Sequence, residues 1–261
     1  MLFLFIACTP PSEDTSSFGS WELFWTDEFD GAENTEPDPT KWLHDVGGDG
    51  WGNNQLEYNT STTNNVRLTG DGFLEIRANR ENLGDNEYTS GRIKTKERFE
   101  HSYGRYEARI KLPEGQGLWP AFWMLGANID EAGWPACGEI DILEMRGDNP
   151  QTVMGTIHGP GYSGGSGLGG EFSRESSFAD DFHVFRVDVD DQHLSWFVDD
   201  EHYLTITPGD LPVGTAWVYD HDFFLLLNLA VGGNFLEDPT EETAFPASML
   251  IDYVHVYRRV E

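Results

Sequence analysis

The chain has 261 residues, of which 38% are hydrophobic and 13% aromatic, and this content is enough to bury one good-sized core. Its 16 basic residues stand against 46 acidic residues, so the formal net charge at pH 7 is −30. A charge of this sign repels phosphate backbones and anionic head groups. We therefore expect a single folded domain that does not bind nucleic acid.

The first residues carry a pattern of their own. Residues 1–8 form a short apolar run that ends in a small residue and Cys8, and a Pro- and Ser-rich stretch follows at residues 9–19. This resembles the end of a bacterial lipoprotein signal in which Cys8 carries the lipid, although the run is too short to span a membrane. We expect an exported protein, in the cell envelope or extracellular, with residues 1–19 as a signal remnant and flexible tether and residues 20–261 as the folded domain. The only other cysteine, Cys137, leaves no disulfide framework to predict.

From Trp21 onward, short runs of alternating apolar and polar residues recur between clusters of Gly, Pro, Asn and Asp. Half-buried strands are predicted at residues 105–112 and 194–198, and a strand buried on both faces at residues 223–230. A final strand at residues 250–257 is predicted to turn one set of side chains inward, namely Leu250, Asp252, Val254 and Val256. No segment has a helical period, and the pattern predicts an all-β fold of two packed antiparallel sheets, a β-sandwich of jelly-roll type.

Residues 139–144, with the sequence EIDILE, place three carboxylates inside a stretch that otherwise reads as a buried strand. Because a strand alternates its faces, Glu139 and Asp141 share one face and Glu144 points the other way. A one-residue bulge near residues 142–143 would bring all three acids to one surface. Like charges this close are costly to desolvate, so the cluster indicates catalysis by paired carboxylates.

Retaining glycoside hydrolysis uses two carboxyl groups about 5 to 5.5 Å apart, one as nucleophile and one as general acid. Five positions along a flat strand span up to about 16 Å. The motif therefore predicts a concave sheet, which is also the shape that an extended polysaccharide needs as a cleft. Asp141, between Glu139 and Glu144, can hydrogen-bond the nucleophile and keep the two outer groups at different pKa values.

Residues 134–147 resemble the active-site strand of glycoside hydrolase family 16, laminarinase type, which has a concanavalin-like jelly-roll fold. Further segments match the family in the same order, at residues 25–30, 50–54, 88–96, 118–126, 156–159, 225–233 and 251–257. The resemblance implies that Glu139 is the nucleophile, that Glu144 is the acid and base, and that Asp141 supports Glu139. It also implies that His158 faces the cleft, whereas a lone histidine is more often structural.

Sugar rings stack on flat apolar side chains that are bordered by hydrogen-bonding groups. Trp119, Trp123 and Trp134 flank the acidic motif and are candidates for this role, although tryptophan in a β-protein is ordinarily core. Trp196 and Trp217 are predicted to be core residues. By the resemblance, Asn53 and Arg92 hydrogen-bond the glucan near the cleavage point; the alternative is a turn Asn and a surface Arg.

The resemblance further implies one structural calcium ion away from the cleft, held by the backbone carbonyls of Glu28 and Gly72 and the carboxylate of Asp252. An inward Asp252 without a partner would be costly, so a hard cation is a sensible solution, and a buried hydrogen bond is the alternative. No cofactor is expected for catalysis.

The predicted function is endo-hydrolysis of β-1,3-glucosidic bonds in laminarin-like glucans, or in mixed β-1,3-1,4-glucans, with retention of configuration. The glucan is the expected partner, and a monomer is expected. Three alternatives remain: a non-catalytic β-glucan-binding protein, a calcium-dependent adhesin, and a hydrolase or transglycosylase of the same family that acts on another polysaccharide. Asp188-Val189 and Asn234-Phe235 depart from the family pattern and leave the finer specificity open.

Overall fold

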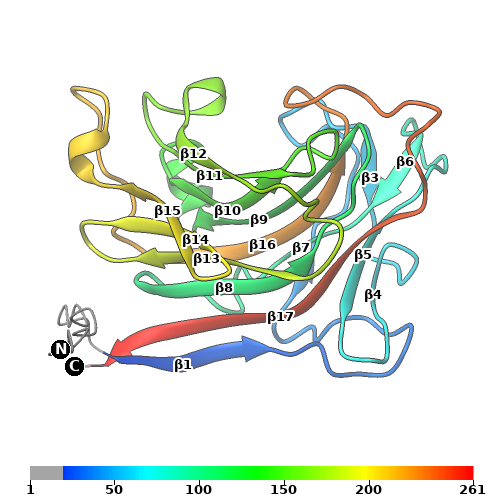
Figure 1. Cartoon of the computed structure of the whole chain (residues 1–261), viewed down its shortest axis with the longest axis horizontal. Coiled ribbons are helices and arrows are strands. Elements are labelled where there is room, and N and C mark those ends of the chain that lie inside the picture. Colours follow the sequence, from blue (N-terminus) through cyan, green and yellow to red (C-terminus); the bar gives the residue numbers. More distant parts are fainter. Residues whose placement is uncertain (1–19, 261) are drawn as a thin grey trace, which may run out of the picture.

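The computed structural model describes residues 20–260 and is built almost entirely from β-strands (Figure 1). The predicted signal remnant and tether, including Cys8, lie outside the described residues. Helical structure within the described part is limited to α1 (Ile129–Ala132) and two 3-10 turns at Gly164–Ser166 and Pro208–Asp210. None of these helices is long or apolar enough to cross a membrane.

Two antiparallel sheets pack face to face, which confirms the predicted sandwich. The outer sheet has the order β15-β14-β13-β8-β17-β5-β4, with β1 also paired to β17. Its strands are β1 (Ser20–Asp27), β4 (Val66–Leu68), β5 (Leu74–Ala78), β8 (Gly104–Lys111), β13 (His183–Val189), β14 (Leu194–Val198), β15 (Glu201–Ile206) and β17 (Ala247–Val260).

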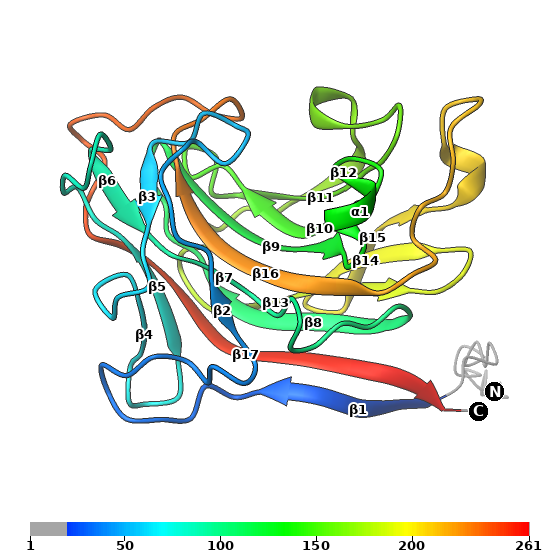
Figure 2. The same ribbon diagram turned by 180° about the vertical axis from the view of Figure 1, so that it is seen from behind.

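The inner sheet has the order β12-β11-β10-β9-β16-β7-β2. Its strands are β2 (Leu43–His44), β7 (Arg92–Lys94), β9 (Leu118–Gly126), β10 (Glu139–Met145), β11 (Thr152–His158), β12 (Leu168–Ser173) and β16 (Phe223–Val231). A short parallel pair, β3 (Glu57–Asn59) and β6 (Tyr88–Ser90), stands beside them. The long strands of the inner sheet bend away from the outer sheet (Figure 2), and this curvature makes their free side concave.

The core lies between the two sheets, and the alternation read from the sequence produces it. In β8 the inward residues Tyr106, Ala108 and Ile110 are fully buried, while the intervening residues are only partly buried. All nine residues of β16 are buried, as the unbroken apolar run predicts. One face of β16 packs in the central core, and Leu226 on its other face packs with Leu125 and Cys137.

The predicted inward face of β17 is wrong in its first half. Met249 and Ile251 point inward instead of Leu250 and Asp252, and the register shifts between Ile251 and Tyr253 before Val254 becomes the next buried residue. This register shift lies where β17 changes its hydrogen-bonding partner on the side opposite β8. The pairing of β17 with β5 ends at Ile251, and its pairing with β1 begins at Val254. Asp252 therefore lies on the outer face, where its Oδ2 accepts a hydrogen bond from Arg109.

The predicted bulge in β10 is confirmed. The register of β10 shifts between Asp141 and Glu144 against β11, and between Asp141 and Leu143 against β9. Ile142 and Leu143 are both buried as a result, and Glu144 returns to the side of Glu139.

A buried tryptophan from the other sheet fastens this bulge. The indole Nε1 of Trp196, in β14, donates a 2.8 Å hydrogen bond to the backbone carbonyl of Asp141. Trp196 is fully buried, as predicted for a core residue. Its indole packs directly on Gly155 of β11, where a Cβ would lie 2.4 Å from the indole ring, so only glycine fits at that position. The outer sheet thus holds the bulge in place.

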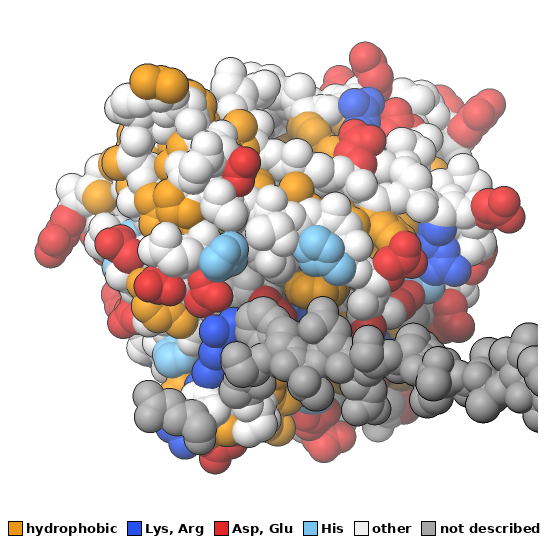
Figure 3. Space-filling view, turned by 60° about the vertical axis from the view of Figure 1, so that its left-hand side comes forward, with side chains coloured by type: hydrophobic (Ala, Val, Ile, Leu, Met, Phe, Trp, Pro, Cys, Tyr) orange, Lys and Arg blue, Asp and Glu red, His pale blue; other side chains and the backbone are white. Residues whose placement is uncertain are grey.

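The surface carries the charge that the composition requires. On the face shown in Figure 3, acidic side chains are spread widely and basic ones are few, in keeping with a net charge of −30. Asp188, one of the departures from the family pattern, forms a two-point ion pair with Arg105 on the outer sheet, at 2.8 and 2.9 Å. It belongs to the packing of that sheet and not to the cleft.

Candidate active site

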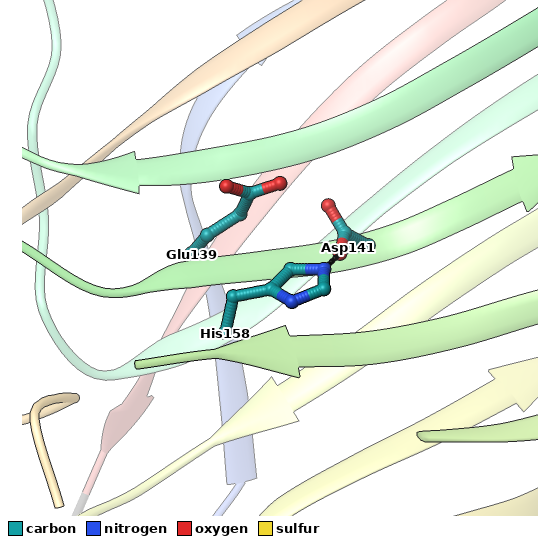
Figure 4. A group of neighbouring side chains, drawn as sticks. All are labelled: Glu139, Asp141 and His158. Carbon is teal, nitrogen blue, oxygen red and sulfur yellow. Dashed lines mark ion pairs between the residues drawn. The ribbon is translucent and has the colours of Figure 1, made fainter. Parts of the chain in front are cut away.

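Three carboxylates from β10 reach the concave side of the inner sheet. Glu139 and Glu144 are partly exposed there, while Asp141 between them is 2% exposed. Figure 4 shows Glu139 and Asp141 on the same side of β10, with His158 beside them on β11. The bulge therefore gives the arrangement that paired-carboxylate chemistry needs, with two outer acids and a buried one between them.

Each outer acid accepts a hydrogen bond from a tryptophan. Trp134 Nε1 donates to Glu139 Oε2 at 2.5 Å, and Trp119 Nε1 donates to Glu144 Oε1 at 3.0 Å. Trp119 lies in β9 and is 8% exposed, whereas Trp134 follows α1 in the chain and is 50% exposed. Trp119 and Trp134 therefore bind the outer acids directly, whereas Trp123 is the cross-strand neighbour of Asp141 in the β9–β10 ladder. Trp134 presents the most open indole face of the three.

The environment raises the pKa of every acid in the cluster. Burial and the neighbouring Asp141 charge raise the pKa of Glu139 to about 8, and burial raises the pKa of Asp141 well above its usual range. Glu139 and Asp141 are hydrogen-bonded and therefore share a proton. We place it on Asp141, because Asp141 is the more deeply buried and Glu139 already accepts a hydrogen bond from Trp134. With Asp141 neutral, the charge that helps to raise the pKa of Glu139 is removed, and Glu139 is the carboxylate of the pair. Burial and the Glu139 charge raise the pKa of Glu144 to about 7.

His158 faces the acids, as the resemblance implies. It pairs across the β10–β11 ladder with Glu139, and its Nε2 lies 3.1 Å from Asp141 Oδ2. Its Nδ1 is buried and makes no hydrogen bond to a described residue. Gly167 packs against the ring, since a Cβ at that position would stand 2.4 Å from Cε1 and 2.6 Å from Nδ1 of His158. Both steric packing against Gly167 and the contact with Asp141 therefore fix the position of the imidazole.

Arg92 is fixed beside the cluster and is not a free surface residue. Its guanidinium lies between the rings of Trp51 and Trp123, at 4.8 Å from each centroid, and its Nε donates to Asp45 Oδ2 at 3.0 Å. Trp123 in turn donates from Nε1 to Asn228 Oδ1 at 2.6 Å. Burial lowers the pKa of Arg92, whereas the negative charge of Glu139 is close enough to raise it. The group formed by Arg92, Trp51, Trp123 and Asp45 therefore lies next to the acids. Two aromatic rings and one cation thus lie beside Glu139.

Sequence reasoning missed three members of this assembly. Trp51 and Asn228 lie inside segments that match the family, and a single polar residue in the apolar run of β16 was the available signal for Asn228. Asp45 gave no signal, because its role follows from a contact with Arg92 across 47 positions of chain.

Asn53 lies at the rim. Its backbone carbonyl accepts a 2.7 Å hydrogen bond from the amide of Asn234, and the side chain of Asn54 donates to Asn234 Oδ1 at 2.9 Å. The next residue, Phe235, has its ring 4.8 Å from that of Trp119. Phe235, one of the departures from the family pattern, therefore makes an aromatic contact with the tryptophan that binds Glu144.

The three predicted calcium ligands lie away from the acids, at the point where β17 changes partner. Glu28 directly follows Asp27, the last β1 residue that pairs with β17. Gly72 lies two positions before Leu74, the first β5 residue that pairs with β17. Asp252 is one of the two residues between the two ladders. The premise that Asp252 is an inward acid without a partner is wrong, because it is partly exposed and paired with Arg109.

Two carboxyl groups on one side of a bulged strand, each bound by an indole N–H, are the arrangement of a polysaccharide-cleaving hydrolase of the double-displacement type. The family model for glycosyl hydrolases family 16 matches residues 51–220, and the chain belongs to this family.

The similarity extends over nearly the whole chain. It is 41% identical over 271 residues to a beta-glucanase of Rhodothermus marinus, covering 100% of this chain and 94% of the relative. It is 38% identical to a glucan endo-1,3-beta-glucosidase of Cryptopygus antarcticus, covering 90% and 92%. Among solved structures, the laminarinase catalytic domain of Thermotoga maritima MSB8 superposes with a TM-score of 0.88 at 44% identity, covering 92% of this chain and 99% of that chain.

Replacing Gly167 by Ala tests whether the ring of His158 must stay in place. The new Cβ displaces the imidazole, and we expect kcat to fall about 10- to 100-fold with little change in KM, since a misplacement of about 1 Å has effects of that order. Steady-state kinetics on a soluble β-glucan measure both constants.

The matched control is Gly165→Ala in the same loop, where a Cβ meets nothing within 4 Å and the backbone is compatible with alanine. This variant should keep wild-type kinetics. Equal losses in both variants would show that the loop, and not the histidine contact, matters.

Proposed function

We propose that the protein hydrolyses internal β-1,3-glucosidic bonds of laminarin-like glucans with retention of configuration. The observation that carries the proposal is the pair Glu139 and Glu144 on one side of the bulged β10, each bound by an indole N–H and separated by the buried Asp141. The names of the relatives, which include endo-1,3-beta-glucosidases and laminarinases, support the linkage.

In the first step Glu139 attacks the anomeric carbon and Glu144 gives its proton to the departing glycosidic oxygen. The raised pKa of Glu144, about 7, keeps that proton available in neutral solution. Trp134 and the protonated Asp141 hold the attacking carboxylate by hydrogen bonds, so the free lone pair of Glu139 is the one that faces the sugar.

The second step reverses the roles. Once Glu139 is an ester its charge is gone, and the pKa of Glu144 falls because that charge was one cause of its elevation. Glu144 then takes a proton from water, and the resulting nucleophile attacks the same carbon from the face that the leaving group vacated. The product keeps the β configuration, and both carboxyl groups return to their starting protonation states.

The cleft accounts for a neutral glucan as substrate. Its walls offer the rings of Trp134, Trp119 and Phe235 and the Trp51–Arg92–Trp123 stack, which suit the C–H faces and hydroxyl rims of pyranoses. The net charge of −30 disfavours sulfated polymers such as carrageenan. We extend the proposal to mixed β-1,3-1,4-glucans, with the β-1,3 linkage as the one cleaved fastest.

Purified protein incubated with laminarin, lichenan, agarose and carrageenan tests the proposal through reducing ends and through the anomer first seen by NMR. We expect release from laminarin, less from lichenan, none from the other two, and β-anomer first. Glu139→Gln and Glu144→Gln should each lower kcat at least about 10²-fold, with laminarin binding retained. An initial α-product would exclude double displacement, and binding without any release in the wild type would favour the non-catalytic alternative.

The pH dependence of kcat/KM should depend on the hydrogen bond from Trp119 to Glu144. Glu144 must be protonated for the first step, so kcat/KM falls as pH rises through its pKa of about 7. The Trp119 hydrogen bond lowers that pKa, so Trp119→Phe should move the alkaline limb of the profile to higher pH. Trp123→Phe is the control, because that indole donates to Asn228 and not to an acid, and its alkaline limb should stay in place.

We also propose the structural calcium site at Glu28, Gly72 and Asp252. The support is that the β5 and β1 ladders stop on either side of Asp252, near Gly72 and Glu28, and that Arg109 engages only one of the Asp252 oxygens. The ion would tie the ends of β1 and β5 to β17.

Calcium at 100 times its dissociation constant should add about 2.7 kcal/mol to the unfolding free energy and raise Tm by several degrees. The variant Asp252→Asn should lose this response. Asp188→Asn, which removes another outer-sheet carboxylate paired with an arginine, should retain it. A calcium response that survives Asp252→Asn would place the ion elsewhere.

We further propose that the protein is exported as a monomer and tethered to the cell envelope through a lipidated Cys8. The support is the apolar run, the cysteine and the polar stretch at residues 9–19 of the sequence. The mass of the mature N-terminal peptide tests the acylation, and light scattering of the protein without this stretch tests the monomer.

A further inference from the structure

Three side chains at the floor of the cleft come close enough to share one ion. Glu139, Asp141 and His158 each offer a ligand atom, and these atoms all lie within 4.8 Å of one another (Figure 4). Two of the groups are carboxylates and the third is an imidazole. The set differs in this respect from a simple cluster of acids.

One of the atoms that face one another lacks a hydrogen bond. Asp141 Oδ2 is buried and makes no hydrogen bond to a described residue, although His158 Nε2 lies only 3.1 Å away. The two atoms are close enough to form an ion pair when His158 is protonated, but they are not aligned for a hydrogen bond. A buried carboxylate oxygen without a hydrogen bond is costly, and a metal ion bound to it would remove that cost.

The spacing matches a tetrahedral metal site. Bonds of about 2.0–2.1 Å from zinc to nitrogen and oxygen place neighbouring ligand atoms about 3.3 Å apart. The 3.1 Å between Asp141 Oδ2 and His158 Nε2 is close to this value. Glu139 completes the set with a rotation of its long side chain, because its ligand atom is already within 4.8 Å of the other two.

We propose that Glu139, Asp141 and His158 bind one divalent transition-metal ion such as Zn²⁺, and that this ion competes with the glucan for the cleft. His158 Nε2, one oxygen of Asp141 and one of Glu139 are the protein ligands. The fourth position faces the open side of the sheet and holds water.

The ligand set selects the class of metal. Calcium takes six to eight oxygen ligands, and magnesium demands an octahedron of oxygens, so three groups that include an imidazole suit neither. Zinc, cobalt and copper accept one nitrogen and two carboxylate oxygens. This site is therefore distinct in chemistry from the all-oxygen site at Asp252.

The consequence for activity rests on the proposed function, whereas the binding does not. An ion bonded to Glu139 engages the lone pair that attacks the sugar, and it stands where the reacting ring must lie. Bound metal therefore inhibits hydrolysis and plays no part in it. Glucan and metal exclude one another.

Cobalt(II) is the probe for binding, because a tetrahedral site with nitrogen and oxygen ligands gives it a visible absorption band. The protein is titrated with Co²⁺ in excess Ca²⁺, which fills the site at Asp252. We expect one Co²⁺ per chain, displaced by Zn²⁺ and by a laminari-oligosaccharide. Glu139→Gln, which keeps the size of the side chain, and His158→Asn should each weaken Co²⁺ binding at least tenfold.

The control is His255→Asn. His255 also stands between two carboxylates, with Nε2 2.7 Å from Glu28 and Nδ1 3.7 Å from Glu107, but on the outer sheet. This variant should bind Co²⁺ like the wild type. A band that survives both cleft variants, or that is lost in His255→Asn, would overturn the assignment.

Inhibition is measured separately on laminarin. At a Zn²⁺ concentration equal to its dissociation constant, the apparent KM should double while kcat stays unchanged, and a chelator should restore the original KM. A metal that lowers kcat without raising KM would refute the competition. If laminarin is not a substrate at all, the cobalt titration still decides the binding, so the two failures are distinguishable.

Discussion

The bulge in β10 is the constraint on which the site depends. A regular strand would send Glu144 into the core between the sheets, where an unpaired carboxylate is costly, and would leave Glu139 without a partner acid. With the extra residue, Ile142 and Leu143 both fill the core and Glu144 returns to the concave side. Trp196 from the opposite sheet binds the carbonyl at the start of the bulge, so the geometry of the acids is fixed by packing in the core behind them.

Burial then separates the roles of three like groups. The middle acid is deepest and keeps a proton, which turns it from a repelling charge into a hydrogen-bond donor for its neighbour. The outer acids differ in what they contact: Glu139 meets Trp134 and Asp141, while Glu144 meets Trp119. The protein thus obtains a nucleophile and an acid from the same type of side chain.

Local patterns allowed much of this to be predicted. The alternation in β8, the two-sided burial of β16 and the bulge in β10 all follow from the order of apolar and polar residues, and the structure confirms them. The failures depend on contacts distant in sequence. The inward placement of Asp252 was wrong because β17 exchanges β5 for β1 at that residue, and Asp45 was missed because its partner Arg92 comes from another strand.

The margins of the two sheets bear on how copies of the molecule meet. Edge strands with unpaired amides and carbonyls can pair with a strand of another molecule, and long, flat edge strands do so most readily. Here β2 and β4 are very short, and β12 contains two adjacent glycines. The pairing of β1, the longest marginal strand, has a register shift between Leu23 and Trp25, and the pairing of β15 with β14 has one between His202 and Leu204. Together with the mutual repulsion of strongly anionic surfaces, this leaves little template for fibrous assembly, even where many copies crowd along one polymer.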